Sequence, residues 1–206
     1  MMHKLEIKLA EAKQAIAIPD FKRDDLLRLA LTDLSTLQLP FVSEQERQDI
    51  VLQYRRLAFL GDRLLDAVVA DYYFTNCSPL SNQDLDDSRQ YTTSRESLAQ
   101  FAISLGLPNF CSSWNKPSRK LPQDEPGVYG EMFEVLIAVI YLDSDRDFQK
   151  IYDWFCDRFI LEIAGESEED FESDEDCDLS ISDEDYLDMI GLQGFPDAWV
   201  PGDDDD

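Results

Sequence analysis

The 206-residue sequence has a single histidine and four cysteines, and the cysteines are scattered without any pair at metal-ligand spacing. Zinc sites and catalysis by a Cys–His or Ser–His arrangement are therefore not expected. The sequence also lacks an apolar run of membrane-spanning length and the apolar start of a signal peptide. These features predict a cytoplasmic protein without a membrane segment.

Basic residues are scarce, and they are missing from the last part of the chain. Residues 1–159 hold all 18 Lys and Arg together with 25 acidic residues, a net charge of −7. Residues 160–206 hold 19 acidic residues and no basic one. The broad basic stripe by which nucleic-acid binders displace phosphate counter-ions is therefore not expected. Contacts with RNA would have to use two small clusters, Arg55, Arg56 and Arg63, and Lys116, Arg119 and Lys120.

What the sequence does contain is a helical pattern of apolar residues over most of residues 1–164. These residues recur at spacings of three and four, and no segment shows the sustained alternation of a strand, which predicts an all-α fold. Gly106 is expected to end a helix. The predicted helices cover residues 4–17, 24–34, a segment starting near Ser43, 55–75, 84–105, 129–142 and 145–164, with a loop at 107–128.

Two helix starts have recognisable capping residues. Asp24 or Asp25 is expected to cap the second helix, because an Asp side chain can accept a hydrogen bond from the first free backbone N–H groups. Ser43 is followed three residues later by Glu46, and this spacing predicts a capping box.

Composition divides the chain into three parts. We expect an N-terminal helix over residues 1–17, a main helical domain over residues 18–164 and an acidic tail over residues 165–206. The tail has too little apolar surface to offset the entropy lost on ordering, so we predict that it is disordered. An apolar island from Tyr186 to Trp199 leaves open the alternative of a docking motif.

Paired carboxylates interrupt two of the most apolar predicted helices. Asp62 and Asp66 are four residues apart, and Glu131 and Glu134 are three apart, so each pair shares one face of its helix. Mg²⁺ and Mn²⁺ prefer oxygen ligands, and Mg²⁺ usually keeps several waters, so a few carboxylates suffice. Taken alone, however, paired acids on a helix usually mark a solvated face.

The segments around these acids resemble the ribonuclease III family. RRLAFLGDRLLDAVVADYYF at 55–74 resembles the signature helix of that family, and GEMFEVLIAVIYLD at 130–143 resembles its second acidic helix. FKRDDLLRLALTDLS at 21–35 resembles its opening helix, although Asp33 stands where the family usually has His. TSRESLAQFAISLGL at 93–107 resembles its middle helix.

This resemblance covers about residues 18–160 and implies a helical endonuclease domain that forms a homodimer. The implied reaction is the cleavage of double-stranded or structured RNA with Mg²⁺, or with Mn²⁺, by metal-assisted phosphodiester hydrolysis. Carried over position by position, the metal ligands of the family correspond to Asp62, Glu131 and Glu134. Asp62 and Glu134 are also the implied catalytic residues.

Glu131 stands where the family has Asp, and two positions of the signature helix also depart from the family pattern. Ala58 stands where the family has a glutamate ligand, and Arg55 replaces a glutamate further upstream. Residues 55, 58 and 62 share one helical face, so we expect a weakened metal site in which Arg55 pairs with one of the three acids. Typical family members also continue into a double-stranded RNA-binding domain, where this sequence has its acidic tail.

Two functions therefore stay open. The chain is either a metal-dependent endoribonuclease of weak or lost activity, or a non-catalytic dimeric module that binds RNA or protein. In the second case the tail would recruit a basic protein partner. The tail is expected to act mainly as a solubilising segment, with autoinhibition over Arg63 and the Lys116 cluster as the alternative.

Overall fold

The computed structural model describes residues 2–34, 43–77, 80–111 and 125–160, with side chains from residue 9 onwards. Every regular element in these ranges is a helix, which confirms the predicted all-α fold. They belong to one compact unit, Met1–Gly165. None of the described helices has both the length and the apolar content that crossing a membrane requires. The predicted acidic tail lies outside the described residues.

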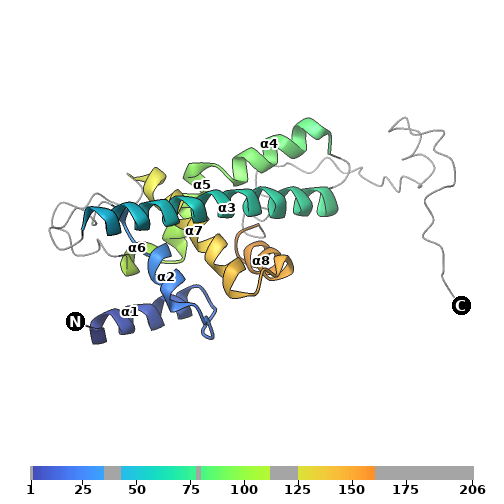
Figure 1. Cartoon of the computed structure of the whole chain (residues 1–206). Coiled ribbons are helices and arrows are strands. Elements are labelled where there is room, and N and C mark those ends of the chain that lie inside the picture. The colour runs from blue at the N-terminus through green and yellow to red at the C-terminus, as the bar shows by residue number, and fades with distance from the viewer. Residues whose placement is uncertain (1, 35–42, 78–79, 112–124, 161–206) are drawn as a thin grey trace, which may run out of the picture. The chain divides into compact units, whose positions relative to one another are not determined.

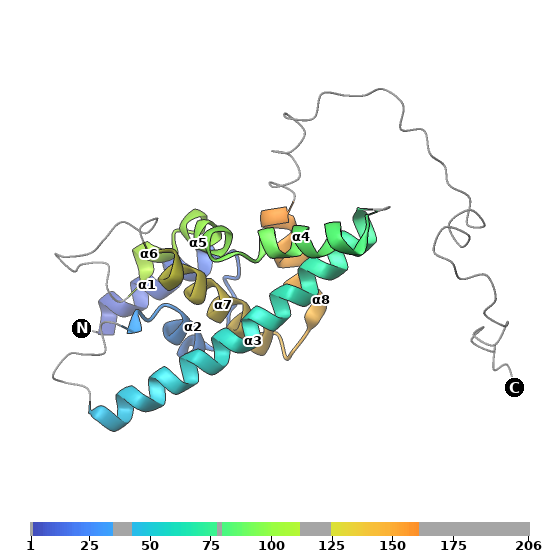
Figure 2. The same ribbon diagram turned by 90° about the horizontal axis from the view of Figure 1, so that it is seen from above.

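One helix, α7, lies at the centre of the domain. It packs against α3 and against α5, and α2 and α8 also contact it (Figures 1 and 2). Helix α4 lies along the C-terminal half of α3 (Figure 2). In chain order the elements are α1 (Met2–Ala15), α2 (Asp24–Ala30), α3 (Glu44–Asn76), α4 (Asn82–Thr92), α5 (Arg95–Ser104), α6 (Leu107–Phe110), α7 (Pro126–Asp143), α8 (Phe148–Phe155) and the π-helical turn η3 (Cys156–Ile160).

Helix α7 is buried on nearly all sides, as expected for a helix whose apolar residues surround it. The four positions predicted as its core, 133, 136, 137 and 140, are buried, but so are positions on its other faces. The acidic residues of α7 therefore do not lie on an open solvated face. The buried residues of α7 are Tyr129, Gly130, Met132, Phe133, Val135, Leu136, Ile137, Ala138, Val139 and Ile140.

Gly61 allows α3 and α7 to cross at very short distance. A Cβ atom at this position would lie 1.8 Å from the carbonyl oxygen of Glu134 and 2.6 Å from its carbonyl carbon. No side chain fits at such a distance, so the close backbone approach requires glycine. This crossing determines which residues of the two helices become neighbours.

Helix α3 begins with the predicted capping box. The backbone N–H of Glu46 donates to Ser43 Oγ at 3.2 Å, and the backbone N–H of Ser43 donates to Glu46 Oε2 at 3.1 Å. The helix then runs for 33 residues to Asn76, so the two segments predicted separately are one helix. Gly106, with φ at +68°, follows the C-cap of α5 and confirms the predicted stop.

The prediction of one helix over residues 84–105 is wrong, because two helices occupy this segment. Helix α4 ends at Thr92, and Ser94 caps α5 by accepting a hydrogen bond from the backbone N–H of Ser97 at 3.2 Å. A serine that bonds to the backbone ahead of it favours a new helix start over continuation of the old helix. The signal was present as consecutive Thr and Ser residues at 92–94.

The predicted cap of α2 is also wrong. Asp24 and Asp25 lie inside the first turn, and Arg23 at the N-cap position makes no side-chain cap bond. Asp143, at the end of α7, accepts hydrogen bonds instead from the backbone N–H groups of Lys22 and Arg23 at 2.9 and 2.7 Å. The helix ends at Ala30, before the predicted limit of residue 34.

The remaining helix boundaries differ from the prediction by a few residues. The expected loop at 107–128 contains the short helix α6, and α7 already begins at Pro126, a residue suited to the first helical position. The last helix begins at Phe148, after Asp147 caps it, and continues into η3. Residues 161–164 of the predicted helix lie outside the described part of the chain.

Candidate active site

The three predicted site residues lie around the crossing of α3 and α7. Asp62 follows Gly61 on α3, while Glu131 and Glu134 lie one turn apart on α7. All three side chains are half-buried. The charges of Asp62 and Glu131 both act on Glu134, so the three carboxyl groups form one electrostatic cluster.

Glu134 has the most perturbed carboxyl group of this cluster. Burial raises its pKa to about 7, and the negative charges of Asp62 and Glu131 contribute to this shift. The positive charges of Arg95 and Arg63 oppose it. A carboxyl group that titrates near neutral pH beside other acids is typical of functional sites, because a bound cation or proton relieves the repulsion.

Tyr54 is a buried residue beside the cluster that sequence reasoning missed. Its side chain is 2 % exposed. Burial raises the pKa of the phenol, and the charges of Glu131, Asp33 and Glu134 raise it further. The hydroxyl group therefore stays protonated next to the acids. The available signal was its spacing, since residues 54, 58 and 62 follow one another at intervals of four on α3.

Ala58 lies on α3 one turn before Asp62, and its side chain is buried. A methyl group has no oxygen to offer, so this turn of α3 provides one carboxylate, that of Asp62. That the α3 side of the site is short of ligands therefore stays a prediction from the sequence.

Arg63, and not Arg55, is the counter-ion of Asp62. Arg63 Nη2 lies 2.5 Å from Asp62 Oδ2, whereas Arg55 makes no ion pair with any described residue. The predicted pairing of Arg55 with Asp62, Glu131 or Glu134 is therefore wrong. Arg55 is seven residues before Asp62, about 10 Å along the helix axis, whereas Arg63 is its immediate neighbour.

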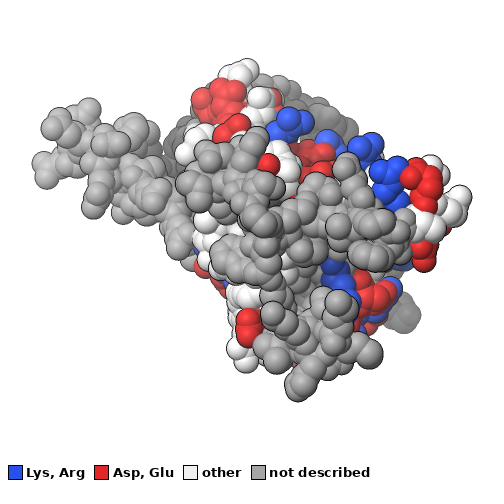
Figure 3. Space-filling view, turned by 90° about the vertical axis from the view of Figure 1, so that its left-hand side faces the viewer, with Lys and Arg blue, Asp and Glu red and all other residues white. Residues whose placement is uncertain are grey.

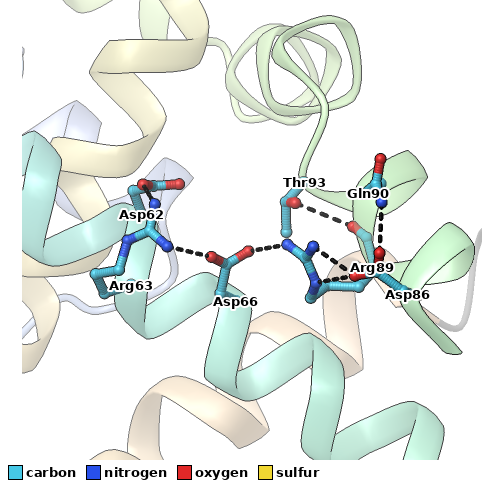
Figure 4. A network of polar contacts seen from close by, with 7 residues as sticks. All are labelled: Asp62, Arg63, Asp66, Asp86, Arg89, Gln90 and Thr93. Atoms are coloured by element: carbon cyan, nitrogen blue, oxygen red, sulfur yellow. Dashed lines mark hydrogen bonds and ion pairs between the residues drawn. The ribbon is translucent and has the colours of Figure 1, made fainter. Parts of the chain in front are cut away.

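The pair of Asp62 and Arg63 belongs to a longer network that joins α3 to α4 (Figure 4). Arg63 Nη1 lies 2.9 Å from Asp66 Oδ2, and Arg89 Nη1 of α4 lies 2.7 Å from Asp66 Oδ1. Arg89 Nη2 in turn lies 2.6 Å from Asp86 Oδ1. Positive and negative groups thus alternate from Asp62 at the candidate site to Asp86 on α4.

The three carboxyl groups have the donor chemistry that a hard divalent ion requires. Oxygen donors are what Mg²⁺ and Mn²⁺ prefer, and positive charge would relieve the repulsion around Glu134. The side chains are not convergent, however, since no three Asp, Glu, His or Cys residues in the described ranges are grouped closely enough to hold one ion. Asp62 would have to leave Arg63 and turn towards Glu131 and Glu134.

One face of the molecule carries described side chains of both charges. In the view of Figure 3, described Lys and Arg side chains lie beside described Asp and Glu side chains. Lys116, Arg119 and Lys120, the second predicted RNA-contacting cluster, lie outside the described residues. In the first predicted cluster, Arg63 forms ion pairs with two carboxylates, those of Asp62 and Asp66.

Comparison with known proteins finds similar sequences. Residues 55–145 match the family model of the ribonuclease III domain. Ribonuclease 3 of Rickettsia bellii is 30 % identical over 125 residues, which cover 61 % of this chain and 52 % of the relative. Ribonuclease 3 of Bartonella bacilliformis is 34 % identical over 128 residues, 60 % of this chain and 48 % of the relative.

A solved structure also matches. The nuclease domain of ribonuclease III from Campylobacter jejuni superposes with a TM-score of 0.56 at 25 % identity, over 74 % of this chain and 95 % of that domain. The helical fold is therefore that of a nuclease domain of the ribonuclease III type. The similarity of the chain, in sequence and in fold, is to the ribonuclease III family, whose domain model matches residues 55–145. It spans about half the length of the curated relatives that it matches.

Proposed function

We propose that the chain is a ribonuclease III-like endonuclease of reduced activity that cleaves double-stranded or structured RNA with Mg²⁺ or Mn²⁺. The observation that carries this proposal is the acidic crossing, where Asp62 and Glu131 act on a Glu134 whose pKa is raised to about 7. A carboxyl group with so strongly raised a pKa is more common at sites that bind cations or transfer protons than on surfaces without a function.

Each residue of the cluster has a distinct part in this proposal. Asp62, Glu131 and Glu134 would hold the ion, which when bound activates water and stabilises charge on the phosphodiester. Without the ion, Glu134 can hold a proton, because its pKa is raised to about 7. Tyr54 stays protonated and buried, so it presents a neutral group rather than a further negative charge to the acids.

Two features account for the reduced activity. Ala58 contributes no oxygen ligand, and Arg63 neutralises Asp62 at short distance. A missing carboxylate lowers the affinity for a hard cation, and a neighbouring guanidinium repels it.

The active form in this proposal is a homodimer. Leu52 and Phe59 are 60 % and 68 % exposed, and they lie seven residues apart on the same side of α3. Large apolar side chains grouped on a surface often mark an interface. The matching Campylobacter structure is described as having a region involved in dimer formation, a statement about that protein. Sedimentation equilibrium of the full chain tests the dimer, and a monomer under assay conditions would contradict it.

The second candidate is a non-catalytic dimeric module for RNA or protein. The same two features, Ala58 and the pair of Arg63 with Asp62, favour it. A basic protein partner for residues 165–206 remains a prediction from charge, as do autoinhibition by the tail and its solubilising role, because this segment lies outside the described residues.

Cleavage of a long RNA duplex in the presence of Mg²⁺ or Mn²⁺ distinguishes the two candidates. The native chain is compared with Glu134→Ala, with Ala58→Glu and with Glu11→Ala, a control at an exposed acid far along the chain from the site. Cleavage that is lost in Glu134→Ala and kept in Glu11→Ala supports the enzyme. Cleavage only in Ala58→Glu supports a degenerate site, and none in any folded variant would reject the nuclease.

A further inference from the structure

The carboxylate of Asp62 is paired with a positively charged side chain, that of Arg63. The guanidinium of Arg63 contacts Asp62 through Nη2 and Asp66 through Nη1, so one planar group bridges two carboxylates on successive turns of α3. Arginine suits this task because its nitrogens form a rigid fork, whereas the lysine ammonium acts as a single point charge.

The bridge is anchored from a second helix. Asp66 receives Arg63 on one oxygen and Arg89 of α4 on the other, and Arg89 is itself held by Asp86 (Figure 4). The side chain of Asp66 is only 21 % exposed, whereas that of Arg63 is 61 % exposed. The sheltered end of the network therefore fixes the position of its exposed end, which lies against Asp62.

We propose that Arg63 is the resident counter-ion of the active site and competes with a divalent ion for Asp62. The inference rests on the proposed metal-dependent function, and it adds a residue that regulates cation binding at that site. A carboxylate oxygen in direct contact with a guanidinium is blocked for an incoming ion. An ion that binds Asp62 Oδ2 therefore displaces Arg63 from this oxygen and leaves it on Asp66 alone.

This competition also accounts for the arrangement of the acids. Asp62, Glu131 and Glu134 lie around one helix crossing, yet the described residues include no convergent group of three ligands. Asp62 is turned towards Arg63. Release by Arg63 is the movement that frees the Asp62 side chain for a ligand position beside the two glutamates of α7.

The expected gain from removing Arg63 is moderate. The ion pair of Arg63 with Asp62 is partly exposed and therefore weak, so breaking it lowers the affinity for the ion only slightly. The positive charge of Arg63 also repels a doubly charged ion nearby, which lowers the affinity further. We expect Arg63→Ala to bind Mn²⁺ roughly five- to tenfold more tightly than the native chain. Arg63→Lys keeps the charge without the fork and should lie between the two.

Calorimetric titration of the full chain with Mn²⁺ tests the inference without reliance on catalysis. Arg55→Ala is the matched control, because it removes the same charge from the same helix without touching an ion pair of Asp62. Its affinity should stay within about twofold of native, since an exposed charge about 10 Å away is largely screened. Thermal unfolding of each variant verifies that the fold is kept.

The possible results separate the inference from the proposed function. If the native chain binds Mn²⁺ and Glu134→Ala does not, while Arg63→Ala binds like native, the metal site stands and the competition by Arg63 is refuted. An equal gain in Arg55→Ala would also refute it, since any nearby charge would then act alike. If no variant binds Mn²⁺, both proposals fail.

Discussion

Helices α4 and α7 both pack against α3, but different interactions hold them there. Helix α7 is buried on nearly all sides and meets α3 at Gly61, where the two backbones touch. Helix α4 has one buried residue, Thr92, and is joined to α3 by the ion pair of Arg89 with Asp66 and by a hydrogen bond between the hydroxyls of Tyr73 and Thr92. Close packing positions α7, and polar contacts position α4.

The candidate site lies where these two kinds of contact meet. Glu131 and Glu134 belong to the tightly packed α7, whereas Asp62 and Asp66 belong to the charged network. The location of the acids is therefore set by a rigid helix crossing, and their charge balance is set by partly exposed arginines. The arginines can change without disturbing the helix crossing. Substitution of an arginine is therefore expected to alter cation affinity while the acids keep their positions.

The largest effect should come from Gly61→Ala. The added methyl group would overlap the carbonyl of Glu134, so α3 and α7 must separate. We expect a loss of unfolding free energy of roughly 3 kcal/mol or more, because overpacking at a backbone contact cannot be relieved by turning a side chain. Urea denaturation of the native and variant chains measures it.

Gly127→Ala is the matched control for this change. A Cβ atom at Gly127 meets nothing within 4 Å, and the residue lies in the first turn of α7. This variant should be unchanged or more stable by up to about 1 kcal/mol, since alanine favours helix. Equal stability of the two variants would show that the crossing is not rigid.

Glu134→Gln should have the next largest effect, and the effect should depend on pH. The pKa of Glu134 is raised from 4.5 to about 7 in the folded chain, so the folded state holds its proton more tightly than the unfolded state. Stability from the protonated group is complete below about pH 4.5 and is lost as the pH rises through 7. Glutamine cannot lose this contribution, so the variant should be more stable at pH 8 by roughly 1–3 kcal/mol.

The measurement is the difference in unfolding free energy between Glu134→Gln and the native chain at pH 4.5 and at pH 8. The difference should be small at the lower pH, where Glu134 is neutral in the folded chain. Glu96→Gln, at an exposed position on α5, serves as the control and should show little change between the two values. A gain of the same size at both pH values would mean that ionisation of Glu134 does not matter.

Local signals in the sequence were enough for most of the helices. Apolar spacing identified α3 and α7, and the Ser43 capping box and the Gly106 stop were confirmed because each depends on neighbouring residues. The break between α4 and α5 was missed, because apolar periodicity continues across the polar residues that end one helix and cap the next.

Contacts between distant segments could not be predicted from local pattern. The chain just before α2 is held by Asp143, about 120 positions away, and Tyr54 lies beside acids that α7 contributes. Arg55 was chosen as the counter-ion from the family pattern, but the fold places Arg63 on Asp62 through an anchor on α4. Charge partners depend on which helices meet, and that information is not local.

The smallest predicted effect concerns Arg89→Ala, which removes the ion pairs that hold α4 on α3. Arg89 contacts both Asp66 and Asp86 and is partly sheltered, so we expect a loss of about 1 kcal/mol at low salt. In 1 M salt the screening length falls to about 3 Å, and the loss should shrink by roughly half. Arg56→Ala, an exposed arginine of α3 without an ion pair to any described residue, should be neutral in both conditions. If the loss of stability were the same at both salt concentrations, packing of the aliphatic part of Arg89 would be its cause. Helix α4 would then be held by packing, as α7 is.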